Sequence, residues 1–201
     1  RLIPEEVLHP ATEADIQAVL ARAKKEGKHI TFRAAGTSLS GQAISDSLLV
    51  VCGKKWEQYT VHDEGKSITL QPGIVGQRVN EILKPYGRYF MPDPASLKSA
   101  MVGGIVMNNA SGMSCGTHAN SDRTLLSARI VFTDGFILDT GSADSREEFT
   151  RSHHEVIERI ESLRDEVRAD KELVEKIHRK YSIKNVTGLN ILPFVIFDDP
   201  I

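Results

Sequence analysis

The amino-acid sequence predicts an α+β fold with two lobes. Three observations support this prediction: a helix and two strands alternate in the first quarter of the chain, two hairpin signatures follow, and helical periodicity returns near the end. With 201 residues, of which 40% are hydrophobic, the chain can bury one large or two small cores. We expect a small α/β lobe over residues 1–70 and a larger lobe over residues 71–201, in which helices flank an antiparallel sheet.

The small lobe is expected to begin with a helix over residues 12–26. Thr12 and Asp15 match a capping box, apolar residues follow at helical spacing, and Gly27 supplies a C-terminal stop. The turn residues 63–66, Asp-Glu-Gly-Lys, predict a hairpin. Four short strands are expected from apolar runs that turn residues bound: 29–33, 48–52, 59–61 and 67–71.

The larger lobe is expected to open with a helix that carries Val75 and Leu83 and ends at Pro85. From Met91 to Thr117 the periodicity disappears, and Pro, Gly, Ser and Asn dominate apart from a small apolar core at 101–107. This stretch predicts a long loop. A loop of that length inside a compact domain is usually functional.

A second hairpin and a helical insertion are expected after this loop. Asp134-Gly135 predicts the hairpin turn between strands over 128–133 and 136–140. Helical spacing then indicates an insertion over about 145–181, within which Asp170 can cap a second helix. The apolar run 191–197 resembles a strand.

Charge and composition exclude several functions. Lys and Arg total 25 against 27 Asp and Glu, so the chain has no broad basic field, and we expect no nucleic acid partner. Cys52 and Cys115 are too isolated to form a disulfide framework or a metal site, which favours a reducing compartment. The apolar runs are far shorter than the roughly 20 residues of a transmembrane helix. The predicted location is cytoplasmic, with peripheral attachment to the inner face of the membrane as the alternative.

Residues 33–42 form the first candidate binding loop. They follow a predicted strand and offer many backbone N–H groups unobstructed by large side chains, which suits a pyrophosphate. Gly36 and Gly41 have the spacing of a P-loop, but Gln42 and Ala43 replace its Lys and its Ser or Thr. No G-x-G-x-x-G motif occurs, which argues against a Rossmann dinucleotide site. A solvated surface loop is the alternative interpretation.

A second constellation lies in the aperiodic stretch: Met91-Pro92-Asp93-Pro94-Ala95-Ser96, Gly103-Gly104, Asn108-Asn109-Ala110-Ser111-Gly112 and Cys115-Gly116-Thr117. Paired glycines let a backbone approach a flat ligand closely. Together the two loops resemble the FAD-binding domain of the vanillyl-alcohol oxidase and p-cresol methylhydroxylase type, also called FAD-linked oxidase, and are most similar to its D-lactate dehydrogenase branch.

The resemblance covers nearly the whole chain, from Leu8-His9-Pro10 to the run 184–190. It implies that the first loop and the paired glycines bind the FAD pyrophosphate through main-chain amides, and that the stretch 110–116 lies along the flavin. No catalytic residue and no metal ligand are assigned. The implied cofactor-binding residues are Arg33, Ala34, Ala35, Gly36, Thr37, Ser38, Gly41, Asp93, Ser96, Gly103, Gly104, Asn108, Ser111, Gly112, Gly116 and Thr117.

The sequence departs from the family pattern at four positions. Met101, Ile105 and Cys115 stand where relatives often carry Thr, Asn and Tyr. Thr37 stands where relatives with a histidyl-linked flavin carry the attachment His, so the resemblance implies that FAD is bound non-covalently.

The resemblance also implies a reaction. The parent protein is expected to oxidise a D-2-hydroxy acid such as D-lactate by hydride transfer to flavin N5. Its electrons are expected to pass to a quinone or to an iron-sulfur module, whose cluster lies elsewhere in the parent protein and not in this chain. Two alternatives remain: an NADPH-dependent reductase that shares the FAD fold and lacks the insertion at 145–181, and a non-enzymatic nucleotide-binding or interaction module.

The ends of the chain suggest that it is part of a longer polypeptide. It opens at Arg1 without Met and stops at Ile201, before the closing strand of the flavin domain and the substrate-binding cap domain that are expected to follow from the resemblance. The chain alone is therefore expected to be inactive. Self-association through an exposed sheet edge is a further expectation.

Overall fold

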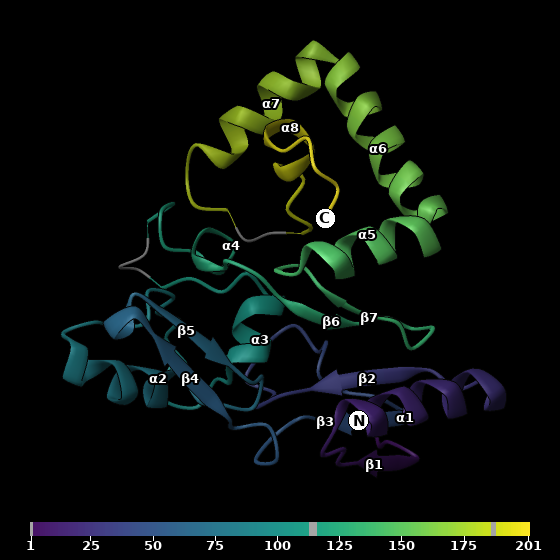
Figure 1. Ribbon diagram of the computed structural model, residues 1–201, viewed down its shortest axis with the longest axis vertical. Coiled ribbons are helices and arrows are strands. Elements are labelled where there is room, and N and C mark those ends of the chain that lie inside the picture. Colours follow the sequence, from purple (N-terminus) through teal and green to yellow (C-terminus); the bar gives the residue numbers. More distant parts are fainter. Residues whose placement is uncertain (1, 113–115, 186–187) are drawn as a thin grey trace. The chain divides into compact units, whose positions relative to one another are not determined.

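The computed structural model describes residues 2–112, 116–185 and 188–201. The chain divides into two compact units (Figure 1): Arg1–Thr124 with Val131–Phe136, and Leu125–Ile130 with Ile137–Ile201. Both helices and short sheets are present, so the α+β prediction is confirmed. The lobe boundary at residue 70 stays a prediction.

A parallel three-stranded sheet organises the first unit. Its strands are β1 (Glu6–Leu8), β2 (Ile30–Arg33) and β3 (Leu48–Val51), in the order β1-β3-β2. Leu48 and Val50 in the central strand have no exposed surface, and burying each side chain contributes about 1.5–3 kcal/mol. The sequence predicted β2 and β3 but not β1.

Helix α1 (Glu13–Glu26) packs beside this sheet (Figure 1). The predicted capping box is present, because the Thr12 side chain accepts from the Asp15 N–H and the Asp15 carboxylate accepts from the Thr12 N–H. At the other end Gly27 has the left-handed conformation, with φ 64°. The apolar face of α1 joins β3 and Trp56 in one core cluster.

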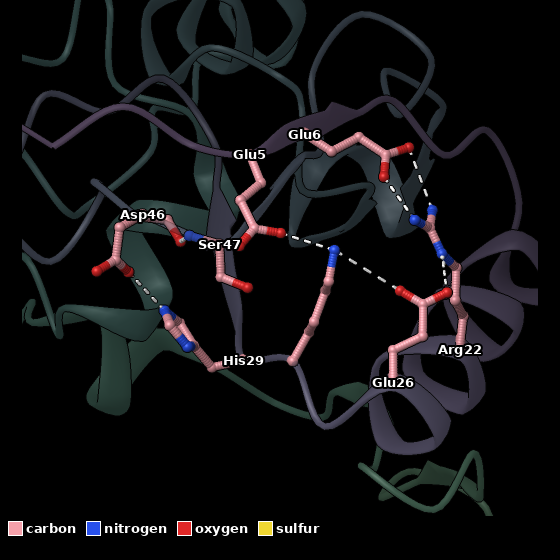
Figure 2. Close-up of polar contacts among 9 residues, drawn as sticks. Glu5, Glu6, Arg22, Glu26, His29, Asp46 and Ser47 are labelled. Atoms are coloured by element: carbon pink, nitrogen blue, oxygen red, sulfur yellow. Dashed lines mark hydrogen bonds and ion pairs between the residues drawn. The ribbon is translucent and has the colours of Figure 1, made fainter.

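An ion-pair network lies at the N-terminal ends of the parallel strands (Figure 2), and we call it the charge network. It consists of Glu5, Glu6, Arg22, Glu26 and Lys28. Two nitrogens of Arg22 donate to the Glu6 carboxylate, at 2.7 and 3.1 Å, and a third donates to Glu26 at 2.9 Å. These bonds hold the pKa of Glu6 below its usual range, and the Glu5 carboxylate raises the pKa of Lys28.

His29 and Asp46 form a separate pair at the same ends of β2 and β3 (Figure 2). The His29 ring nitrogen and the Asp46 carboxylate lie 2.8 Å apart. This hydrogen bond lowers the pKa of Asp46. The charged groups at this end therefore bond one another.

The first hairpin and helix α2 build a second core in the first unit. Strands β4 (Tyr59–His62) and β5 (Ser67–Leu70) pair antiparallel, as predicted, around the short turn η1 (Asp63–Gly65). Helix α2 (Gly76–Leu83) runs into η2 (Lys84–Tyr86), which contains Pro85 as expected. The core residues here are Ile74, Val79, Leu83 and Val102.

The loop expected over 91–117 contains a short helix, α3 (Val102–Met107), and in this respect the prediction was wrong. A second short helix, α4 (Ser121–Thr124), follows that stretch. Val102 and Ile105, one turn apart in α3, are both buried, and this packing outweighs the weak helix propensity of the glycines between them. The Ile105 side chain packs with Leu97 and Ala100, which suits an apolar residue at this position.

The second hairpin forms as predicted, from β6 (Arg129–Val131) and β7 (Ile137–Asp139). At the turn of this hairpin, the Phe132 N–H donates to the Phe136 carbonyl at 2.8 Å. At its open end, the Thr140 N–H donates to the Ala128 carbonyl at 2.9 Å.

Helices fill most of the second unit (Figure 1): α5 (Ala143–Ser152), α6 (His154–Ala169), α7 (Lys171–Tyr181) and α8 (Pro193–Ile196). The predicted insertion is therefore helical, and Asp170 caps α7 by accepting from the Leu173 N–H at 3.0 Å. Within the described part of the chain, no helix is long and apolar enough to cross a membrane.

The prediction of a strand near the C-terminus was wrong, because helix α8 forms there instead. Pro193 occupies the first turn of α8, where its missing N–H costs nothing. The Arg168 guanidinium of α6 donates to the carbonyls of Phe194, Val195 and Phe197 at 2.7 to 3.3 Å, which satisfies backbone acceptors that a sheet would otherwise pair.

Candidate functional site

The first candidate loop leaves the C-terminal end of the parallel strand β2. Ligands of α/β sheets bind at this end of the strands. Gly36 and Gly41 have φ values of 69° and 80°, a conformation that glycine adopts without strain. The Arg33 side chain lies over Gly36, where an added Cβ would come within 2.5 Å of its guanidinium. The loop is therefore built around glycines, as the sequence suggested.

Helix α3 lies against this loop, although about 70 residues separate them in sequence. A Cβ placed on Gly104 would be 3.7 Å from the Cβ of Ala34, and the Gln42 side-chain amide donates to the Asn108 side chain at 3.2 Å. The structure thus brings together Ala34, Gly104 and Asn108 from the two predicted loops. Gln42, which the sequence used only to exclude a P-loop, joins them.

The two paired glycines have different surroundings. A Cβ on Gly103 would lie 2.6 Å from the Pro72 Cβ, and the Gly103 N–H donates to the Pro72 carbonyl at 2.9 Å. Gly103 thereby lets α3 approach the end of β5. Gly104 has room for a Cβ, so its small size is not needed for packing within the described chain. Direct cofactor contacts from both glycines stay predictions.

Asp93 and Gly112 meet on another side of the site. A Cβ on Gly112 would overlap the Asp93 carbonyl, so only glycine allows this approach. A cavity of about 250 Å³ opens beside Asp93, and its lining residues are Asn80, Tyr89, Phe90, Met91, Asp93 and Ala119. This volume is below the roughly 300–1,000 Å³ of ordinary ligand pockets, so the cavity accommodates only part of a large cofactor.

In the part of the chain that the structure describes, two buried side-chain oxygens have no hydrogen-bond partner: Ser111 Oγ and Asn120 Oδ1. Leaving such an atom unpaired costs about 1–3 kcal/mol, and a native protein normally satisfies it through a ligand or water. Ser111 is one of the predicted flavin contacts. An open glycine face at Gly104 and an unpaired hydroxyl at Ser111 are what a cofactor with many acceptors and donors requires, so the residues fit FAD.

The remaining predicted residues are less constrained by described contacts. Thr37 is exposed, whereas Ala35 and Ser38 are half-buried. The Ser96 carbonyl accepts from the N–H groups of Ser99 and Ala100 at 2.8 and 2.7 Å, which forms the turn before α3. Gly116 and Thr117 follow residues 113–115, and Cys115 lies outside the described residues, as do Val186 and Thr187.

Sequence reasoning missed Ser121. Its side chain is buried, and its hydroxyl lies within hydrogen-bond distance of the carbonyls of Ile105 and Ala110. The only sequence signal was a Ser at the start of a short helical turn. Cys52, in contrast, is a packing residue as expected, and burial raises the pKa of its thiol.

The geometry of the two loops suits an extended anionic cofactor, whereas the described residues form no metal site. Across residues 2–112, 116–185 and 188–201, no three His, Cys, Asp or Glu side chains are arranged to hold a metal ion. Comparison with known families decides the cofactor: a family model described as an FAD binding domain matches residues 4–141. The chain belongs to this family. FAD is its cofactor, and this confirms the cofactor predicted from the two loops.

Known proteins of similar sequence include dehydrogenases and glycolate oxidase subunits. The chain is 26% identical over 200 residues to a D-2-hydroxyglutarate dehydrogenase of Haemophilus influenzae, a match that covers 92% of this chain and 20% of the relative. It is 25% identical over 136 residues to a D-lactate dehydrogenase of Archaeoglobus fulgidus, covering 67% of this chain and 30% of the relative. The chain therefore spans less than a third of either protein.

Solved structures show the same fold. 6-Hydroxy-D-nicotine oxidase of Arthrobacter nicotinovorans matches with a TM-score of 0.63 and 17% identity, over 74% of this chain and 32% of that structure. At this identity the match supports the fold alone. The predicted fold, an FAD-binding domain of the vanillyl-alcohol oxidase and p-cresol methylhydroxylase type, is confirmed.

Proposed function

We propose that this chain is the FAD-binding part of a flavin-dependent dehydrogenase that oxidises a D-2-hydroxy acid. The observation that carries the proposal is the family match over residues 4–141, taken with relatives whose names specify D-2-hydroxyglutarate and D-lactate. These two acids share a hydroxyl on the carbon next to the carboxylate. D-Lactate itself is the substrate predicted first, and D-2-hydroxyglutarate is the second candidate.

The residues of this chain bind and orient the cofactor. The first loop offers backbone N–H groups and α3 offers the open face of Gly104 to the pyrophosphate, while Ser111 offers its hydroxyl to the flavin. When bound, FAD would supply the two-electron acceptor for a hydride from substrate C2, and with loss of the hydroxyl proton to a base the 2-hydroxy acid would become a 2-oxo acid. We assign neither that base nor a substrate-binding residue to this chain.

The reductase alternative is disfavoured by the second unit. A reductase that shares the FAD fold is expected to lack the insertion, whereas α5, α6 and α7 occupy residues 143–181. The cap domain, the electron acceptor and the cytoplasmic location stay part of the proposal.

The test uses the full-length protein with its flavin bound. Anaerobic addition of D-lactate or D-2-hydroxyglutarate is expected to bleach the oxidised flavin absorbance, and the L-enantiomers are expected to leave it unchanged. Bleaching by NADPH, with no response to either hydroxy acid, would favour the reductase. A purified protein that binds no flavin would contradict both.

We also propose that FAD is held without a covalent bond, because the threonine hydroxyl of Thr37 cannot form the linkage that a histidine supports. Acid precipitation of the flavin-loaded protein is expected to leave the yellow colour in the supernatant. Colour that stays with the precipitate, and with a peptide containing residues 33–42, would contradict this. The same treatment of free FAD added to albumin gives the control for trapping.

A further inference from the structure

Ser121 is a buried polar residue whose side chain bonds to residues distant from it in sequence. Its side chain is 2% exposed, and Oγ lies 3.1 Å from the Ile105 carbonyl and 3.0 Å from the Ala110 carbonyl. A hydroxyl has one hydrogen, so it donates to both acceptors by sharing or to one at a time. The Ile105 carbonyl also accepts from the Ala110 N–H at 2.8 Å. The bond to Ala110 is therefore the one that adds a constraint.

A second bond ties the same helix to the same segment. The Asp122 N–H, next in α4, donates to the Asn109 side-chain oxygen at 3.0 Å. Asn109 has φ 45°, a left-handed conformation that fixes the direction of the chain as it leaves α3. Helix α4 thus holds the segment 109–112 at two successive residues, Asn109 and Ala110.

This segment carries the unpaired hydroxyl of the site. Ser111 lies between Ala110, which Ser121 anchors, and Gly112, which rests against the Asp93 backbone. Its Oγ is buried and has no hydrogen-bond partner among the residues that the structure describes. Anchors on both neighbours fix the Ser111 backbone, and an unpaired hydroxyl held in this way is ready to bond a cofactor without further ordering cost.

We propose that Ser121 is a positioning residue for FAD: its hydroxyl anchors the Ala110 carbonyl so that Ser111 presents its own hydroxyl to the cofactor. Ser121 does not contact FAD in this proposal. The inference rests on the family's cofactor and not on the hydroxy acid proposed above, so cofactor binding tests it without any substrate.

The main experiment is a double-mutant cycle on flavin-free full-length protein. Ser121→Ala and Ser111→Ala are each expected to raise the Kd for FAD about tenfold, the effect of losing one well-formed hydrogen bond. Because Ser121 acts through Ser111, the double variant is expected to bind FAD no more weakly than Ser111→Ala alone. Titration of the flavin fluorescence gives the Kd values. Additive losses, or an unchanged Kd in Ser121→Ala, would overturn the proposal.

Thr124→Val provides the matched control for helix stability. The Thr124 hydroxyl donates to the Asn120 and Ser121 carbonyls, at 3.4 and 3.2 Å, so its bonds stay in the residues of α4 and the one before it. This variant loosens α4 without touching segment 109–112. Its Kd for FAD is expected to change less than twofold. A loss equal to that of Ser121→Ala would assign the effect to helix stability and overturn the proposal.

A second variant covers the case in which Ser121→Ala fails to fold. Asn109→Gly keeps the left-handed backbone but removes the acceptor for Asp122 N–H, at an exposed bond. It is expected to raise the Kd for FAD severalfold. The double variant with Ser111→Ala is again expected to bind FAD no more weakly than Ser111→Ala alone. Additive behaviour in this pair would count against the proposal in the same way.

Discussion

The two ends of the parallel sheet β1-β3-β2 use polar groups in opposite ways. At the N-terminal ends of the strands, the charged side chains bond one another in the charge network and in the His29–Asp46 pair (Figure 2). At the C-terminal end of β2, glycines and small residues dominate the loop, and after α3 Ser111 has a buried hydroxyl with no partner among the described residues. The charged side chains at the N-terminal ends of the strands therefore already have partners within the chain.

This difference separates a structural cluster from a binding site. A group that has found its partner within the chain gains little from a ligand, whereas an unpaired buried group gains a hydrogen bond that folding left unmade. Charge density alone would have pointed to the charge network. Unsatisfied bonding capacity, together with room beside glycine, points to the loops and to α3.

The largest effect on stability is expected where a glycine allows two backbone segments to approach each other closely. Gly112→Ala places a Cβ onto the Asp93 carbonyl, so the backbone of the site must move. We expect a loss of about 3 kcal/mol or more in the free energy of unfolding, measured by urea denaturation of the flavin-free protein. Stability within about 0.5 kcal/mol of the parent would show that this approach of the two segments is wrong.

Substitutions at Gly104 are expected to weaken FAD binding without unfolding the protein. Gly104→Val should abolish FAD retention during desalting, because its side chain extends into the face predicted to receive the pyrophosphate, while the fold remains. Gly104→Ala has an ordinary contact with Ala34, so its flavin-free stability should change by less than about 1 kcal/mol while affinity falls partway. Normal flavin occupancy in Gly104→Val would place the cofactor elsewhere.

A smaller effect is expected at the start of α1. Thr12→Ala removes the side-chain acceptor of the α1 capping box and should cost about 1 kcal/mol of stability. The Kd for FAD should not change, because the cap lies outside the cofactor site. Weakened FAD binding in Thr12→Ala, beyond its loss of stability, would mean that this cap is coupled to the cofactor site.

The smallest effect is expected from the carboxylates. Hydrogen bonds lower the folded pKa values of Glu6, Asp15 and Asp46, chiefly from Arg22, from the Ala11 N–H and from His29 respectively. Their stabilisation is complete above the unfolded pKa values near 4 and is lost as pH falls through the lower folded values. Arg22→Met should flatten the Glu6 part of this acid dependence, and about 1 M salt should do the same by screening. Melting curves between neutral pH and acid give the measurement.

Local signals in the sequence predicted the elements that depend on local bonds. The helix α1 followed from Thr12, Asp15 and Gly27, and both hairpins followed from their turns. Strand β1 has three residues, too few for a periodic pattern, and it exists because β3 pairs with it. Helix α3 was hidden by its two glycines. The run at 191–197 resembled a strand, because so short an apolar run has no periodicity that separates strand from helix, and bonds from Arg168, more than twenty residues away, favour the helix.

The site divides in the same way. Glycine-rich loops are visible in a sequence because the residue type itself carries the conformational freedom, and the family resemblance then named the positions. Ser121 was invisible because serine is common at the start of helical turns, and its acceptors lie 11 and 16 residues away. The carbonyls that accept from its hydroxyl can be identified only in the folded structure.

The strand order also constrains the timing of folding during synthesis. β1 and β2 both pair with β3, which lies between them and comes last in the chain. As the polypeptide emerges from the ribosome, α1 can form from its own capping box, but β1 and β2 have no edge to join until Leu48–Val51 has appeared. We therefore expect nascent chains arrested before residue 48 to be helical at α1 yet protease-sensitive throughout, and chains that extend past Val51 to acquire protection of both outer strands in one step.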